Sequence, residues 1–286
     1  MFKNSILFGL MFILAITGCE EKMDIEIEGK KQKKLVVEGC ITSDTMSHSV
    51  TLSWTTSFFT LEARDMETGA TVTISDGDQV FQLDESEPGI YKTAPVVYGI
   101  PGNTYTLDVV TRDGQHFTAS ETMPGVIYVD SVTQSGNYNH FDFTTNAMGY
   151  GYDILYHGPE PAGSGDYYLW NLYMNNELYN DTIFESMFVD DAFVDGNYIK
   201  NFPVYFIHEN DVQSDSVLVT LESLTITRGY YSFIIGLMLE TVWRGSPWDG
   251  PPANVETNIK PNGMGYFYAA GSSKESIFLE KKPRMD

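Results

Sequence analysis

The chain has 286 residues, of which 39 are acidic and 17 are Lys or Arg, and its formal net charge is -22 at pH 7. A surface with this excess of negative charge repels nucleic acid, so we expect neither a nucleic-acid nor a polyphosphate partner. Aromatic residues make up 14% of the chain, which argues against intrinsic disorder. The length is sufficient for a large buried core and leaves room for two domains.

The first segment, residues 1–18, has the pattern of a lipoprotein signal peptide. A short polar start precedes an apolar run from Ile6 to Ile16, which is too short to span a bilayer. The run ends at Ile16-Thr17-Gly18-Cys19, which resembles the bacterial lipobox, whose cysteine is acylated and becomes the first mature residue. The alternative is an ordinary signal peptide with an incidental cysteine. We therefore expect Cys19 to carry outer-membrane lipid and residues 19–34 to form a charged tether.

The second cysteine has no partner within the mature chain. Once Cys19 is acylated, Cys40 is the only thiol left, so an internal disulfide is excluded. Cys40 lies in the apolar run of residues 35–41, and this context favours a buried, small hydrophobic residue over a reactive thiol.

Residues 35–124 predict an immunoglobulin-like β-sandwich. About seven short strands with alternating apolar residues are separated by turn residues at the spacing typical of such sandwiches. Asp113-Gly114 can supply the positive φ angles of a tight hairpin. The expected strands lie at or near residues 35–41, 50–54, 72–74, 80–83, 89–91, 105–109 and 117–119.

Residues 125–286 predict a second, β-rich domain that contains one helix, so the chain as a whole is expected to be mainly β. Residues 230–242 lack strict alternation and follow Thr227, which is suited to an N-cap, so they favour an amphipathic helix packed on a sheet. A strand is the alternative, because several of these residues are aromatic or β-branched. The segment is too short to span a membrane. Strands are expected at residues 141–144, 150–156, 167–173, 204–207 and 216–223.

Seven phrases of the sequence follow one another as they do in one known family. The phrases are Leu35–Thr42, Ala70–Gly77, Gly89–Tyr91, Gly102–Leu107, Val129–Val132, Pro251–Ile259 and Gly263–Phe267. In their order and spacing they resemble the DUF4249 family of Bacteroidetes outer-membrane lipoproteins, over nearly the whole mature chain. Cys40 departs from the pattern, because an aromatic residue is expected there.

The resemblance implies a location and a partner more than a chemistry. Proteins of this family are usually encoded beside TonB-dependent outer-membrane receptors, which implies a surface-exposed accessory to nutrient uptake. Glu20-Glu21 resembles the acidic signal that sends Bacteroidetes lipoproteins to the outer face. The family supplies no catalytic residues and no ligand.

No catalytic motif is present in the sequence. His208-Glu209 begins like the zinc-protease motif, but the position of the second histidine is taken by Val212. Gly163-Ser164-Gly165 is too tight for a nucleophile elbow. We therefore expect a non-catalytic binding module without a cofactor. A structural or adhesive envelope lipoprotein is the alternative, followed by a hydrolase without a recognisable motif.

Carboxylates before a glycine turn make Asp190, Asp191 and Asp195 candidate calcium ligands. An EF-hand is excluded, because Phe193 and Phe202 stand where that loop requires oxygen ligands. A site of another kind remains open there, and also at Asp76-Gly77-Asp78. Solvated turn residues are the alternative in both places.

Aromatic residues are the remaining candidates for binding. Trp243, Arg244, Trp248 and Tyr266 follow the expected helix, and a tryptophan in a loop rich in Gly and Pro has few core neighbours. These four residues are our candidates for contact with a ligand or partner. Tyrosines also crowd residues 138–179, where they suit either binding or the core of a sheet.

Overall fold

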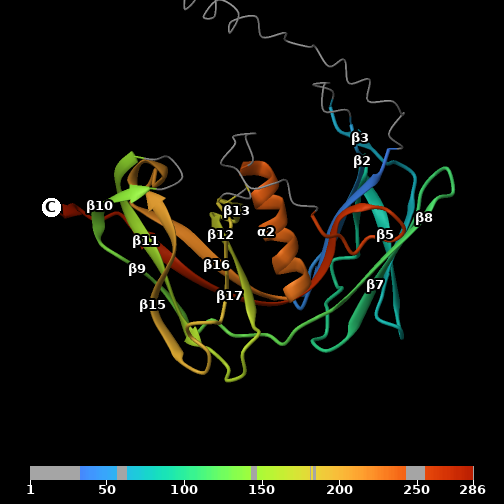
Figure 1. Ribbon diagram of the computed structural model, residues 1–286. Helices are drawn as coiled ribbons and strands as arrows, with labels where there is room; N and C mark the ends of the chain where they lie inside the picture. The colour runs from blue at the N-terminus through green and yellow to red at the C-terminus, as the bar shows by residue number, and fades with distance from the viewer. Residues whose placement is uncertain are drawn as a thin grey trace, which may run out of the picture. The chain divides into compact units, whose positions relative to one another are not determined.

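The computed structural model describes residues 33–56, 63–142, 147–180, 182, 185–242 and 255–285. These residues belong to one compact unit that begins at Lys33. The described part is mainly β with a single α-helix, labelled α2 (Figure 1), which confirms the predicted fold class.

All seven strands expected between residues 35 and 124 are present. Alternation explains them: in β7, Tyr105, Leu107 and Val109 are buried while the residues between them face outwards. The short β3 is an addition that the pattern did not predict. The elements are β1 (Leu35–Thr42), β2 (Ser49–Trp54), β3 (Asp65–Met66), β4 (Thr71–Ser75), β5 (Val80–Glu87), β6 (Ile90–Lys92), β7 (Thr104–Val110) and β8 (His116–Thr122).

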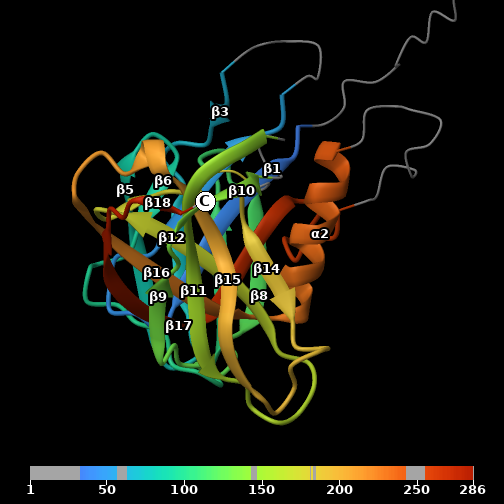
Figure 2. The ribbon, with the colours of Figure 1, turned by 90° about the vertical axis from the view of Figure 1, so that its left-hand side faces the viewer.

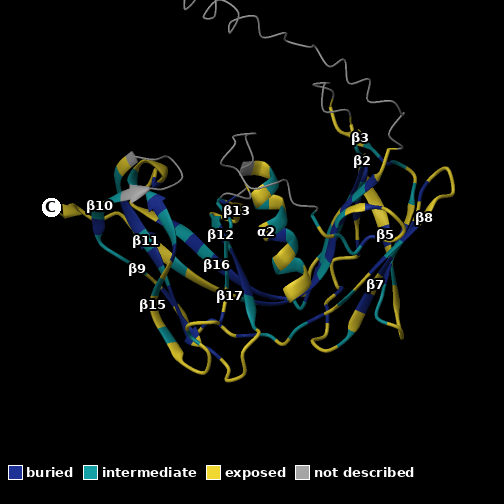
Figure 3. Cartoon of the chain, viewed as in Figure 1, coloured by how far each residue is buried: buried dark blue, intermediate teal, exposed yellow. Residues whose placement is uncertain are grey.

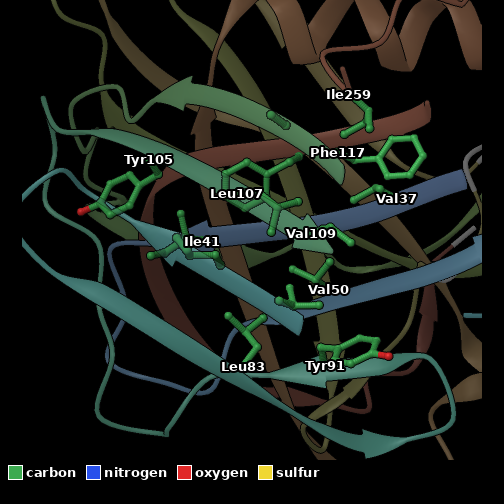
Figure 4. Packing of buried hydrophobic residues seen from close by; sticks show 14 of the residues in the cluster. Val37, Ile41, Val50, Leu83, Tyr91, Tyr105, Leu107, Val109, Phe117 and Ile259 are labelled. Carbon is green, nitrogen blue, oxygen red and sulfur yellow. The ribbon is translucent and has the colours of Figure 1, made fainter. Parts of the chain in front are cut away.

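These strands enclose the first hydrophobic core (Figure 4), to which nearly all of them contribute fully buried side chains. The strands follow one another in the order β1-β2-β6-β5-β4-β7-β8. Strand β5 joins the two layers around the core. Its first half pairs with β4 and its second half with β6, and the register shifts between Glu85 and Glu87. Such an irregularity bends a strand and lets it pass from one layer to the other.

The second half of the chain extends this strand order and adds one separate sheet. From β1 the order continues through β17, β16 and β12 to β13, with β14 on β12, so that these strands and those of the first half form one 13-stranded sheet. The separate sheet has five strands, in the order β15-β11-β10-β18 with β9 on β11. The strands of the second half are β9 (Ser131–Gln134), β10 (Asn137–Asp142), β11 (Ala147–Pro159), β12 (Tyr167–Met174), β13 (Glu177–Leu178), β14 (Met187–Asp190), β15 (Tyr198–His208), β16 (Ser216–Ile226), β17 (Met264–Glu280) and β18 (Arg284–Met285), and a 3₁₀ turn spans Glu209–Asp211.

The second hydrophobic core lies between these two sheets. Tyr152 and Ile154 of β11 and Trp170 and Leu172 of β12 belong to it, and each is no more than 1% exposed. Figure 2 shows the strands β9, β11 and β15 in front of β12 and β16. The strands expected near 150–156, 167–173, 204–207 and 216–223 are all present, whereas the one expected at 141–144 lies only partly in the described residues.

Strand β17 belongs to both halves of the fold. Its first residues pair in parallel with β1, from Val36↔Met264 onwards, and its later residues pair antiparallel with β16. Gly265 makes the approach to β1 feasible: its φ is 82°, and a Cβ there would lie 2.1 Å from the carbonyl oxygen of Val37. Phe267 of β17 is therefore buried in the first core and Leu279 in the second. The division into domains at residues 35–124 and 125–286 stays a prediction, and residues from beyond 125 complete the first core.

Helix α2 (Arg228–Val242) confirms the predicted helix and excludes the strand alternative. Thr227 caps it, because its Oγ1 accepts a hydrogen bond from the backbone N–H of Tyr230 at 3.2 Å. Ile234 is the buried anchor of the helix and packs with Leu224 and Ala270 on the outer face of the sheet. Figure 3 shows that the helix keeps many exposed residues along its length. Within the described residues, no helix has the length and apolar character needed to cross a membrane.

Candidate functional site

A cavity of about 860 Å³ lies between α2 and the adjoining strands β1 and β17. Strand alternation determines which side chains reach it. Glu38 pairs with Tyr266 and Cys40 with Tyr268 on the cavity side, whereas residues such as Phe267 point into the first core. The volume falls within the range of small-molecule sites, which are about 300 to 1,000 Å³.

Four aromatic rings form one wall of this cavity. Tyr230 and Phe233 come from α2, and Tyr266 and Tyr268 come from β17. The rings of Tyr230 and Tyr268 are stacked with centroids 3.9 Å apart, and Phe233 lies 5.2 Å from Tyr266. Rings held in this way offer flat apolar surface against which a planar or sugar-like ligand can stack.

A charged pair lines the same cavity. The guanidinium of Arg64 donates two hydrogen bonds to the carboxylate of Glu38, at 2.8 and 3.1 Å. This contact raises the pKa of Arg64, so its positive charge is fixed at every physiological pH. Both side chains are about half exposed, so the pair contributes little to stability and is available to a polar ligand. The cavity therefore combines an aromatic wall with an orienting ion pair.

Cys40 lies beside the aromatic wall, and its thiol is not an activated nucleophile. Burial raises the pKa of its thiol to about 11, while a hydrogen bond with Tyr268 opposes the shift. The thiol is therefore protonated at neutral pH, whereas nucleophilic cysteines are thiolates. The protonated thiol favours the interpretation as a small hydrophobic residue over a reactive thiol, and the structure shows that Cys40 is only partly buried.

Of the four residues that the sequence proposed for binding, Tyr266 is the one that the structure describes. It lines the cavity, is 8% exposed, and donates a hydrogen bond from its hydroxyl to Glu121 Oε2 at 2.9 Å. Burial raises the pKa of Glu121. Trp243, Arg244 and Trp248 lie outside the described residues, as does Cys19.

Most of the residues that line the cavity were not predicted from the sequence. Tyr230 and Phe233 are one helical turn apart in α2, which is a local signal. The position of Tyr268 beside them depends on where β17 lies in the sheet, which only the structure shows. The tyrosines and tryptophan gathered in residues 138–179 belong largely to the core: Tyr152, Tyr168 and Trp170 are 0%, 2% and 1% exposed.

Of the three candidate calcium ligands, the structure places only Asp191 in a cluster of carboxylates. Asp191 is 3% exposed and lies with Glu160 and Asp166, which the sequence did not single out, whereas Asp190 and Asp195 are exposed. The hydrogen bonds of the turn at residues 76–78 favour solvated turn residues over a calcium site. There Asp76 Oδ1 accepts backbone hydrogen bonds from Asp78 and Gln79, and the bond from Gln79 lowers the pKa of Asp76.

Comparison with known proteins identifies the family of the chain. No curated protein matches the chain. Among solved structures, the crystal structure of murine CEACAM1b matches at 10% sequence identity and covers 88% of this chain and 100% of its own, but the TM-score of 0.20 is below the level of a shared fold. The family model described as "Domain of unknown function (DUF4249)" matches residues 20–276. Because this match spans nearly all of the sequence after Cys19, the chain belongs to the DUF4249 family.

Proposed function

We propose that the protein is a surface-exposed outer-membrane lipoprotein that serves as a non-catalytic binding module for a TonB-dependent nutrient receptor. The lipobox that ends at Cys19 and the acidic Glu20-Glu21 support the location. Membership of the DUF4249 family supports the partner through the gene neighbourhood that is usual for its members.

The cavity beside α2 is the observation that carries the binding role. It joins a wall of four aromatic rings to the Glu38–Arg64 pair, and this combination of apolar area with a few oriented polar groups is characteristic of ligand sites. A small nutrient with a flat apolar face and a polar edge fits this chemistry. A structural or adhesive lipoprotein needs no such cavity.

The location is tested on whole cells. Cys19→Ala should abolish labelling with radioactive palmitate and release the protein from the outer-membrane fraction. Protease added to intact cells should digest the wild-type protein. Complete protection from the protease would place the protein on the inner side of the membrane and contradict surface exposure.

The partner is tested by co-purification. After mild crosslinking, the tagged protein is isolated from detergent-solubilised outer membranes, and we expect a TonB-dependent receptor to copurify. Recovery of the protein alone would contradict the accessory role.

The cavity is tested with two matched variants of α2. Leu237 lines the cavity, whereas Leu239 is 59% exposed on the same helix and does not line it. Leu237→Trp should therefore obstruct ligand binding, and Leu239→Trp should not. A deletion strain grown on single nutrients identifies the cargo: Leu237→Trp should reproduce the growth defect, and Leu239→Trp should grow as the wild type does. A deletion strain without a defect on any nutrient would favour the structural alternative.

A further inference from the structure

A cluster of three carboxylates lies at one end of the second core, far in sequence from the cavity-lining strands. We call Glu160, Asp166 and Asp191 the acidic cluster. Each residue places a carboxylate oxygen within 4.8 Å of the oxygens of the other two. Glu160 and Asp191 are only 4% and 3% exposed, so these are not ordinary surface acids.

The cluster is built from two loops that bind each other. One loop connects β11 to β12 and carries Glu160 and Asp166, and the other connects β14 to β15 and carries Asp191. The backbone N–H groups of Gly165 and Asp166 donate to Asp191 Oδ2 at 2.7 and 3.2 Å. The N–H of Asp191 in turn donates to the carbonyl oxygen of Asp166 at 3.1 Å. These bonds hold the three carboxylates in fixed positions.

Glu160 gives the second, independent indication of a ligand. Its Oε2 accepts a hydrogen bond from the hydroxyl of Tyr168 at 2.6 Å, but its Oε1 is fully buried and has no hydrogen-bond partner. A buried carboxylate oxygen without a partner is costly and is seldom retained without a reason. This oxygen is free to coordinate an ion.

The charges of the cluster also require compensation. Among the described residues, no ion pair involves any of the three carboxylates. Like charges held together in this way are relieved by a cation.

We propose that the acidic cluster binds Ca²⁺. The donors are all carboxylate oxygens, without the histidine or cysteine that zinc and copper prefer. Calcium accepts six to eight oxygens at about 2.3 to 2.6 Å, so two ligands on opposite sides of one ion are about 4.6 to 5.2 Å apart. The three carboxylate oxygens lie within 4.8 Å of one another, so they are close enough together to bind one such ion. Magnesium fits less well, because it usually binds only one or two carboxylates and keeps several waters.

The position of the ion defines its role. Glu160 follows β11 of one sheet, while Asp166 precedes β12 and Asp191 follows β14 of the other sheet. A bound Ca²⁺ therefore links the two sheets around the second core. It also fixes the loop that carries Phe193, an aromatic side chain that is 98% exposed. The site is structural and is independent of the proposed role of the cavity.

The experiment uses the full mature chain with Cys19→Ser, treated with a chelator and then titrated with Ca²⁺ in a calorimeter and in thermal unfolding. We expect one site, and at a Ca²⁺ concentration of 100 times Kd a rise in Tm of about 5 to 10 °C. Glu160→Gln keeps the shape of the side chain and its capacity to accept from Tyr168, and should weaken Ca²⁺ binding at least tenfold. Without Ca²⁺ this variant should be as stable as the wild type or more so, because one like charge is removed. Asp84→Asn, which changes an exposed acid on β5, is the control and should respond as the wild type does.

Three results would overturn the proposal. The first is no binding and no rise in Tm at Ca²⁺ concentrations up to about 10 mM, which exceeds the Kd of weak extracellular sites. The second is an unchanged Ca²⁺ response in folded Glu160→Gln, or in Asp166→Asn if the first variant does not fold. The third is an equal response to Mg²⁺, which would overturn the assignment of the ion.

Discussion

Substitution of Phe267 tests whether strand β17 completes the first core, which is otherwise formed mainly by residues far earlier in the chain. Its side chain is 0% exposed and packs in the first core. Phe267→Ala removes a buried ring and leaves a cavity, because surrounding side chains collapse only partly. Burial of the ring away from water contributes about 1.5 to 3 kcal/mol to the free energy of unfolding, and the substitution removes this contribution. The cavity adds to the loss, so the free energy of unfolding should fall by about 3 to 5 kcal/mol in total.

The same strand supplies a matched control. Phe278 is 68% exposed, so Phe278→Ala should change the free energy of unfolding by less than about 0.5 kcal/mol. Both variants are compared with the wild type by urea unfolding at 25 °C, followed by far-UV circular dichroism. We expect a lower midpoint for Phe267→Ala with an unchanged dependence on urea. A loss below about 1.5 kcal/mol, or equal losses for the two variants, would refute the placement of β17 in the first core.

Three further predictions concern single residues. His48 is buried, and burial lowers the pKa of its imidazole in the folded protein below the unfolded value of about 6.5. Its contribution to stability is therefore complete above pH 6.5. The contribution is lost as the pH falls from 6.5 towards the folded pKa, because the unfolded state then binds a proton that the folded state does not. The wild type should lose more stability than His48→Asn between pH 7.5 and 5.5 in urea unfolding, whereas a parallel pH dependence would contradict this. Thr227→Ala removes the N-cap of α2 and should cost about 1 kcal/mol in thermal unfolding, and an unchanged Tm would show that the cap is not used. The thiol of Cys40 has a pKa of about 11, so at pH 8 only about one molecule in a thousand carries the thiolate that reacts with iodoacetamide. The labelling rate should be correspondingly low and should rise about tenfold per pH unit, whereas labelling as fast as that of glutathione would contradict a protonated thiol.

The candidate sites were only partly predictable because each depends on segments that are distant in the chain. Tyr266 was selected for its aromatic character, and the structure places it in the cavity, but its neighbours come from α2 and β1. Asp191 was selected for a turn that is rich in acids, yet the partners that make a metal site are Glu160 and Asp166 of another loop. A single stretch of sequence shows which residues are chemically suitable, and it does not show which of them meet.

The sequence by itself determined the local structure and the family. Side chains that alternate along the chain specify strands, and Thr227 with the apolar pattern after it specifies α2, because these preferences depend on neighbours within a few residues. Only the tertiary structure decided that β17 pairs with both β1 and β16. The pairing of a strand depends on which neighbours bury its two faces, and these neighbours can lie far away in the sequence. The paired residues of β1 and β17 are more than two hundred positions apart. The cavity and the acidic cluster exist because of that long-range pairing and loop contact, which no local pattern encodes.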